Sequence, residues 1–311
     1  MKIRRWLSEN LTFGRKYLKT TQRELTSVIQ EANLQMTSVY LWDKTLHSKE
    51  RGVSDERLCD EEVIVSLSSH GNRVHDVHLA IESIMQQTML PNRIVLWLSK
   101  DEFQGKTLPI ALQRQVERGL EIAYCENLRS YTKLIPSLER FPGACIITVD
   151  DDLAYSPDLL EKMIQAHISH PSDICAARIH GIVLDAAGKP IPYDNWDWCV
   201  EECPKENNLA FFTGGGGTLY PPGCFPEEVF NRDVYLKDCP TADDVWFNAM
   251  RLLGGIRVTK VYSPNRKGDY MALPSSRVNA LWSKNRKGNN DLAIAAVYGR
   301  YGLYAKLANN K

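Results

Sequence analysis

From Glu62 onward, short apolar runs that fit buried strands alternate with segments whose apolar residues recur at helical spacing. The predicted strands lie at residues 63–67, 94–98, 121–124, 144–149, 174–179 and 256–261. The predicted helices lie at residues 75–87, 108–118, 133–140, 157–164 and 241–253. This alternation predicts an α/β fold with a mainly parallel sheet and helices on its faces.

Residues 1–60 follow a different pattern and are expected to form a basic helical extension. Apolar residues recur at helical spacing over residues 21–40, which predicts a helix there. The first 24 residues hold seven lysines and arginines, interleaved with aromatic side chains, against two glutamates. Such a stretch suits an anionic membrane surface, so residues 1–24 are a candidate for peripheral membrane contact. The alternative is a solvated helix that packs its apolar side on the main domain.

Composition and charge indicate a globular protein and argue against a protein that binds nucleic acid or spans a membrane. The chain has 311 residues, of which 43% are hydrophobic and 24% are charged, which is ordinary for a soluble globular protein. Its formal net charge of zero argues against nucleic acid as a partner. The sequence shows neither an apolar run of roughly 18 residues that would cross a bilayer nor the apolar core of a secretory signal. We therefore expect a cytoplasmic protein, held at the inner face of the membrane if residues 1–24 contact lipid.

The eight cysteines are expected to be free thiols. Cys125, Cys145 and Cys175 lie in apolar, strand-like runs, where a buried thiol behaves as a small hydrophobic side chain. Cys199 and Cys203 are close in sequence but have no second pair at zinc-like spacing, which weighs against a structural zinc site. A disulfide framework is not expected in a chain of this size without a secretory signal.

Three carboxylates, Asp150, Asp151 and Asp152, follow directly after the apolar run 146–149. In open α/β sheets, ligands bind at the carboxyl ends of the strands. Adjacent carboxylates repel one another unless a cation neutralises them, and their oxygens suit Mg²⁺ or Mn²⁺. The run therefore predicts a site for a metal and a diphosphate. The alternative is a solvated turn that caps the strand.

A glycine run and a second acidic pair are further candidates. Residues 214–217 are all glycine, which permits positive φ and close approach of a sugar or phosphate, although a bulge or tight turn also uses glycine. Asp243 and Asp244 open a predicted helix for which Thr241 is the expected N-cap. Acids at this position serve either as favourable charges at a helix start or as a general base for an acceptor hydroxyl.

Basic and aromatic side chains complete the candidates. Arg73 and Lys133 are positioned to contact a nucleotide, or else are surface cations. Three tryptophans either stack on a sugar or belong to the core: Trp196, Trp198 and Trp246. A late basic cluster either closes over a diphosphate or is solvated: Arg266, Lys267, Lys284, Arg286 and Lys287. Because the chain has no Walker motif and no GxGxxG after the first strand, P-loop and dinucleotide-binding proteins are disfavoured.

Taken in chain order, these segments resemble a GT-A glycosyltransferase. Residues 212–217 and 242–247 are similar to the large inverting family that includes cellulose synthases and bacterial capsule transferases, and the acids also resemble those of exostosin-type transferases. The resemblance covers roughly residues 62–261. It implies a GT-A fold in which residues 61–265 form the catalytic domain, with a nucleotide-binding half at 61–155 and an acceptor half at 156–265. Residues 266–311 are then a tail packed on this domain.

The resemblance also implies an activity and roles for residues. The activity is metal-dependent transfer of one sugar from a nucleotide-diphosphate donor, a UDP-sugar in the first instance, to a glycan or lipid-linked acceptor in surface polysaccharide synthesis. Asp152 and Asp150 are expected to bind Mn²⁺ or Mg²⁺. Asp244, with Asp243 beside it, is expected to be the base for the acceptor hydroxyl. The donor is expected to contact Ser66, Arg73, Lys133, Asp150, Asp151, Gly215 and Gly216.

The sequence also departs from the family pattern. No histidine follows His180, although many GT-A enzymes use a late histidine as a metal ligand. The QxxRW helix and membrane helices of processive synthases are missing, which favours a non-processive transferase. The base assignment favours inversion, whereas the exostosin likeness favours retention. A sugar-phosphate nucleotidyltransferase and a non-catalytic carbohydrate-binding protein are the alternatives. The first is disfavoured because residues 68–73 lack a glycine- and lysine-rich signature.

Overall fold

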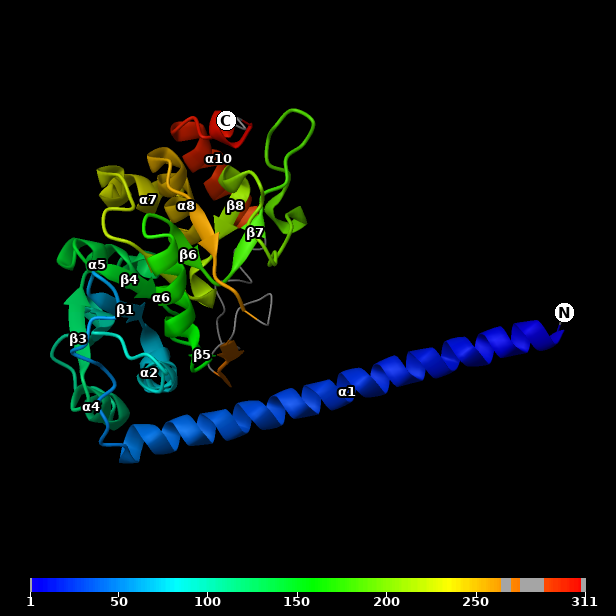
Figure 1. Cartoon of the computed structure of the whole chain (residues 1–311), viewed down its shortest axis with the longest axis horizontal. Helices are drawn as coiled ribbons and strands as arrows, with labels where there is room; N and C mark the ends of the chain where they lie inside the picture. Colours follow the sequence, from blue (N-terminus) through cyan, green and yellow to red (C-terminus); the bar gives the residue numbers. More distant parts are fainter. Residues whose placement is uncertain (1, 264–269, 275–287, 309–311) are drawn as a thin grey trace.

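A twisted, mainly parallel β-sheet forms the centre of the protein (Figure 1). The computed structural model describes residues 2–263, 270–274 and 288–308. Within these residues the sheet has seven strands in the order β10-β6-β9-β4-β1-β2-β3. Only β9 runs antiparallel to its neighbours β4 and β6 among the strand pairs described in this sheet. The α/β fold with a mainly parallel sheet is therefore confirmed.

The sheet strands are short, and most match predicted runs. Their bounds are β1 Val63–Ser68, β2 Arg93–Ser99, β3 Leu120–Cys125, β4 Cys145–Thr148, β6 Ile174–Ala176, β9 Thr218–Tyr220 and β10 Val258–Lys260. Two small antiparallel pairs lie outside the sheet: β5 Leu153–Tyr155 with β11 Tyr270–Ala272, and β7 Ile179–Gly181 with β8 Ala210–Phe212. The patterns of residues 153–155, 218–220 and 270–272 predicted no strands.

Helices pack on both faces of the sheet. The α-helices are α1 Lys2–His47, α2 Val77–Met85, α3 Lys100–Phe103, α4 Ile110–Val116, α5 Ile135–Arg140, α6 Leu159–Ser169, α7 Arg232–Asp238, α8 Asp243–Gly254, α10 Asn290–Arg300 and α11 Tyr304–Ala308. The 3-10 helices are η1 Gly71–His75, η2 Arg129–Lys133, η3 Tyr193–Asn195, η4 Asn207–Leu209, η5 Gly214–Gly216 and η6 Glu227–Phe230.

Alternating side chains of the strands build a core on each face. Val63 and Val65 pack into a cluster with α2, α4 and α6, whereas Ile64 between them packs into a second cluster with α5, α7, α8 and α10. This division follows from the two-residue period of a strand. Each fully buried aliphatic side chain contributes roughly 1.5–3 kcal/mol, so both faces hold the sheet in place. In the described part of the carboxyl-terminal segment, Ala293 and Val297 of α10 are buried.

Two predicted local features are wrong. The run 174–179 is not one strand, because the chain leaves the sheet after β6 and begins β7, which pairs with β8. Thr241 does not cap the helix that follows, since α8 begins at Asp243 and Ala242 occupies its N-cap position.

The helical extension is longer than predicted and mostly stands away from the sheet. Helix α1 covers Lys2–His47 and projects from the rest of the molecule (Figure 1). Among the residues of α1 whose exposure is described, from residue 20 onward, Leu41 and Thr45 in the last turns are buried against the domain. Apolar side chains between residues 25 and 39 are 50–71% exposed: Leu25, Val28, Ile29, Met36 and Val39. The expectation that the extension packs its apolar side on the domain is therefore wrong for this stretch. No helix within the described residues has the length and apolar character to cross a bilayer.

Candidate active site

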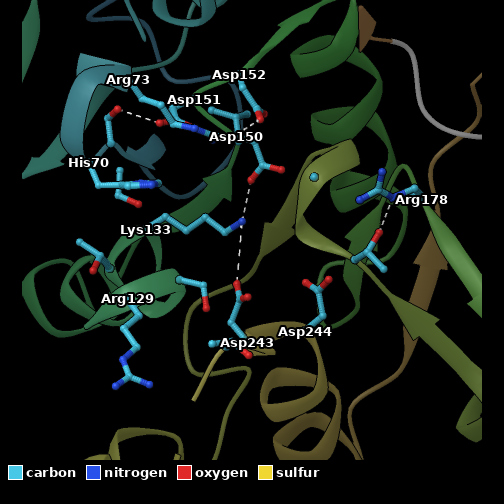
Figure 2. A pocket seen from close by; sticks show the side chains of 18 of the residues that line it. His70, Arg73, Arg129, Lys133, Asp150, Asp151, Asp152, Arg178, Asp243 and Asp244 are labelled. Carbon is cyan, nitrogen blue, oxygen red and sulfur yellow. Dashed lines mark hydrogen bonds and ion pairs between the residues drawn. The ribbon is translucent and has the colours of Figure 1, made fainter. Parts of the chain in front are cut away.

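A cleft of about 870 Å³ opens at the carboxyl end of the sheet. The turn after β1, the acidic residues after β4, the glycine run and the start of α8 all line it. The first three come from different parts of the sequence and meet because the strands that carry them lie side by side in the sheet. Figure 2 shows the charged side chains of these segments converging on one space.

The three acids after β4 have different environments. Asp151 accepts hydrogen bonds from Ser69 Oγ at 2.7 Å and from Arg73 Nη1 at 2.8 Å, so it fastens the β1 turn to the end of β4. Asp152 forms an ion pair with Arg73 Nη2 at 3.1 Å. Asp150 accepts a hydrogen bond from Lys133 Nζ at 2.7 Å. All three acids and both cations line the cleft.

The charge balance of this end of the cleft fits a divalent cation. Burial, followed by repulsion from Asp150 and Asp151, raises the pKa of Asp152 to about 6. Burial also opposes ionisation of Asp150, but the charge and hydrogen bond of Lys133, together with the charges of Arg178 and Arg73, outweigh it and lower the pKa of that carboxyl. A carboxylate that resists ionisation beside other acids gains most from an added positive charge. The oxygen donors of Asp150 and Asp152 match the ligand preference of Mg²⁺ and Mn²⁺.

Lys133 connects the two acidic regions of the cleft. Its Nζ atom lies 2.7 Å from Asp150 Oδ1 and 3.8 Å from Asp243 Oδ2 (Figure 2). Ser66 does not line the cleft, which corrects its predicted contact with a donor. Its fully buried hydroxyl instead donates to the backbone oxygen of Lys133 at 2.5 Å. Ser66 is therefore a residue that positions the lysine.

The glycine run brings backbone against the charged groups of the cleft. A Cβ atom on Gly215 would lie 2.6 Å from Arg178 Nη2 and 2.7 Å from Asp150 Oδ2, and one on Gly216 would lie 2.8 Å from Arg178 Cβ. Both positions therefore require glycine because of space. Gly217 has φ +93°, so its glycine is required for backbone conformation as well. Gly215 lines the cleft, whereas Gly216 backs onto Arg178 and does not, which corrects its predicted donor contact.

Arg178 and Tyr155 are site residues that the sequence did not reveal. Arg178 follows the end of β6 and donates to Thr213 Oγ1 at 2.5 Å and to the Tyr270 hydroxyl at 2.7 Å. Tyr155 accepts a hydrogen bond from the backbone N–H of Asp150 and donates to the carbonyl of Gly215. Its ring thus ties the acidic turn to the glycine run. Neither residue could be recognised in the sequence, because a motif needs several residues at a fixed spacing and each of these stands alone.

The second acidic pair is partly buried and faces the same cleft. Asp244 Oδ1 accepts a hydrogen bond from the N–H of Gly214 at 2.9 Å, which fixes the carboxylate against the glycine run. Burial raises the pKa of both Asp243 and Asp244, and the positive charge of Lys133 opposes this. A carboxylate whose pKa is shifted toward neutrality is suited to accept a proton from a hydroxyl group.

Aromatic side chains form one wall of the cleft. Trp198 and Tyr193 line it together with His180, whose ring lies 4.5 Å from that of Trp198. Burial and the charge of Arg178 lower the pKa of His180 to about 3, so this ring is neutral at pH 7. Trp196 and Trp246 are buried in the core. Trp198 is therefore the tryptophan available to stack on a ligand. The late basic residues 266, 267, 284, 286 and 287 lie outside the described residues.

Comparisons with known proteins find similarity only at the level of structure. No protein-family model and no curated protein sequence matches the chain. Residues 1–349 of S. aureus TarS are similar at 14% identity and a TM-score of 0.46, over 79% of this chain and 71% of that chain. The mannosyltransferase PcManGT from Pyrobaculum calidifontis, solved with GDP-Man and Mn²⁺, is similar at 13% identity and a TM-score of 0.46, over 90% of this chain and 84% of that chain.

Proposed function

We propose that this protein is a metal-dependent glycosyltransferase that moves one sugar from a nucleotide-diphosphate donor to a hydroxyl group of an acceptor. One observation carries the proposal. A single cleft holds an acidic strand end that fits a divalent cation, and Lys133 connects this end to the partly buried carboxylate pair Asp243 and Asp244. Such a pairing supplies a place for a diphosphate and a place for an acceptor within one cleft.

The donor half would be formed by residues 61–155. When bound at Asp150 and Asp152, Mn²⁺ or Mg²⁺ would supply positive charge that stabilises the leaving diphosphate. Arg73 and Lys133 would hold phosphate oxygens, because both are cations that line the cleft. Gly215 would allow the donor to approach the backbone closely. We propose a UDP-sugar as the donor, as the sequence resemblance implies.

The acceptor half would be formed by residues 156–265. An acceptor hydroxyl would attack the anomeric carbon, the bond from that carbon to the diphosphate oxygen would break, and the hydroxyl proton would pass to Asp244. The hydrogen bond from Gly214 keeps the Asp244 carboxylate oriented for this step. A base on the attacking side corresponds to inversion at the anomeric carbon. The aromatic wall with Trp198 would stack on the sugar face of a glycan or lipid-linked acceptor.

We further propose that the amino-terminal extension holds the enzyme at a membrane where surface polysaccharide is assembled. Residues 1–24 are strongly basic, and α1 projects away from the cleft-bearing domain (Figure 1). Basic and aromatic side chains on such a helix would bind anionic lipid. A lipid-linked acceptor would then be presented to the cleft from the membrane surface. The test is co-sedimentation with lipid vesicles. The protein is expected to bind vesicles of anionic lipid and not to bind vesicles of neutral lipid.

Metal-dependent nucleotide binding tests the proposed activity. Thermal unfolding is measured with UDP or GDP, with and without Mn²⁺, and the proposal predicts a stabilisation that requires both ligands. Asp152→Ala should lose this stabilisation, whereas Asp55→Ala is a matched control, because Asp55 is exposed and lies outside the cleft. A screen of nucleotide sugars for metal-dependent hydrolysis then identifies the donor. Normal metal-dependent binding in Asp152→Ala would contradict the metal assignment.

A further inference from the structure

A second group of metal-ligating side chains lies at the opposite end of β4 from the acidic run. β4 begins at Cys145, whose N–H donates to the carbonyl of Glu62 at 2.9 Å just before β1 begins. This bond brings the segment with Cys59 and Glu61 against the start of β4. His167 reaches the same place from α6, which packs on this face of the sheet. None of these four residues lines the cleft.

The four side chains converge as ligands of one ion would. The two Sγ atoms, one carboxylate oxygen of Glu61 and one ring nitrogen of His167 all lie within 4.8 Å of one another. His167 Nε2 is 3.3 Å from Cys145 Sγ and 3.3 Å from Glu61 Oε2. Zinc bonds of about 2.0–2.3 Å in a tetrahedron separate neighbouring ligands by roughly 3.3–3.8 Å. The two measured separations lie at the short end of this range.

The surroundings show why these groups would bind a metal rather than only pack together. His167 and Cys145 are buried, and the Nδ1 atom of His167 has no hydrogen-bond partner within the described residues. The ring is therefore oriented only on its Nε2 side, where sulfur and carboxylate meet.

We propose that Cys59, Glu61, Cys145 and His167 bind one zinc ion that fastens the segment before β1 to β4 and α6. Four protein ligands correspond to a structural rather than a catalytic zinc site, since no position is left for water. Thiolate and imidazole ligands favour zinc over Mg²⁺ or Mn²⁺, so this site and the acidic cleft would select different metals. The inference does not depend on the proposed glycosyltransferase activity.

Metal analysis of the purified protein tests the proposal directly. After dialysis against a weak chelator, mass spectrometry of the metals should find about one zinc per chain in the wild type, as a four-ligand structural site requires. Zinc should be lost from Cys59→Ser and from His167→Ala. Cys175→Ser is the matched control, because Cys175 is a buried thiol on the same face of the sheet but outside the group of four. Asp152→Ala should also keep its zinc, which distinguishes this site from the cleft.

Cobalt substitution keeps the test decisive if a variant fails to fold. The wild type, stripped of zinc and supplied with Co²⁺, should show the absorption of a tetrahedral cobalt–thiolate centre, and removal of the metal should lower Tm by roughly 5–10 °C. Cys59→Ser is the variant of choice because Cys59 is only half-buried. Folded wild-type protein without stoichiometric zinc and without a cobalt–thiolate band would overturn the proposal. A Cys59–Cys145 disulfide in that protein would overturn it as well.

Discussion

Strand β4 has side chains suited to metal binding at both of its ends, and the two ends differ in their ligand atoms and in their access to the cleft. Beyond its carboxyl end, Asp150 and Asp152 offer oxygen atoms to an open cleft and are balanced by Lys133 and Arg73. At its amino end, Cys145 offers sulfur to a group that includes the buried ring of His167. The carboxyl end opens into the cleft, whereas none of the four residues grouped at the amino end lines it.

This difference distinguishes a site that must bind and release a substrate from a site that only has to hold a metal within the fold. Hard oxygen donors bind Mg²⁺ or Mn²⁺ weakly enough for a substrate to enter and leave with the metal. Sulfur and imidazole donors that fill every position bind zinc as part of the fold. Residues at the carboxyl end should therefore govern turnover with little loss of stability. Residues at the amino end should govern stability with little effect on chemistry.

The largest expected effect comes from the proposed base. Asp244→Asn keeps the size of the side chain and an oxygen to accept the Gly214 hydrogen bond, but it removes the proton acceptor. We expect kcat for sugar transfer to fall about 1,000-fold, within the range for loss of a general base, while donor affinity changes little. Steady-state transfer and calorimetric titration with the nucleotide measure the two quantities. Retained turnover in this variant would remove Asp244 from the base role.

The next effect concerns donor binding at the end of β4. Asp152→Ala should weaken Mn²⁺-dependent nucleotide binding about 100-fold, which corresponds to roughly 3 kcal/mol. Its zinc content and its unfolding temperature without ligands should match the wild type within a few degrees. A large loss of stability in this variant would contradict the proposal that residues at the carboxyl end of β4 govern turnover and not stability. Titration of each variant with nucleotide at fixed Mn²⁺ gives the affinity.

A smaller effect is expected from pH. Burial raises the pKa of both acids, to about 7 for Asp243, so the Asp244 carboxylate becomes less available as a proton acceptor as the pH falls. The rate at saturating donor should therefore decrease as the pH is lowered. Because Lys133 lowers the pKa of both acids, Lys133→Met should move this decrease to higher pH. A decrease centred near pH 4 in both proteins would contradict burial as the cause.

The sequence predicted those parts of the fold that depend on local pattern. The runs 63–67 and 146–149 are buried and β-branched, so their strands and the acids that follow them could be located in advance. Strand β9 could not, because its three residues acquire a strand conformation from pairing between β4 and β6. The site followed the same rule. Asp150, Asp152 and Asp244 belong to recognisable local motifs, whereas Arg178 enters the cleft only because the chain leaves the sheet after β6.

The group at the amino end of β4 was missed for the same physical reason. Zinc sites are recognised in a sequence by closely spaced pairs of ligands. The only close pair of cysteines in the sequence is Cys199 and Cys203, and neither belongs to this group. His167 is 22 residues from Cys145 and 106 from Glu61, and folding alone brings them together. A cysteine in an apolar run is also a suitable small side chain for a buried strand. The sequence therefore gives no sign that the Cys145 thiol could bind a metal.

The smallest expected effect compares the cleft with the amino end of β4. One variant from each place is expected to change the stability of the protein in opposite directions. Asp243 has a raised pKa, so its ionised form destabilises the fold, and the stability it contributes when protonated is lost as the pH rises through about 7. Asp243→Asn should therefore stabilise the unliganded protein by about 1 kcal/mol at pH 8. The gain should shrink at pH 6, where the wild-type carboxyl is largely protonated. Cys145→Ser should instead destabilise the protein at both pH values, because it removes a zinc ligand. Urea denaturation of both variants at each pH measures the changes, and a loss of stability in Asp243→Asn at pH 8 would show that the cleft contributes to holding the fold.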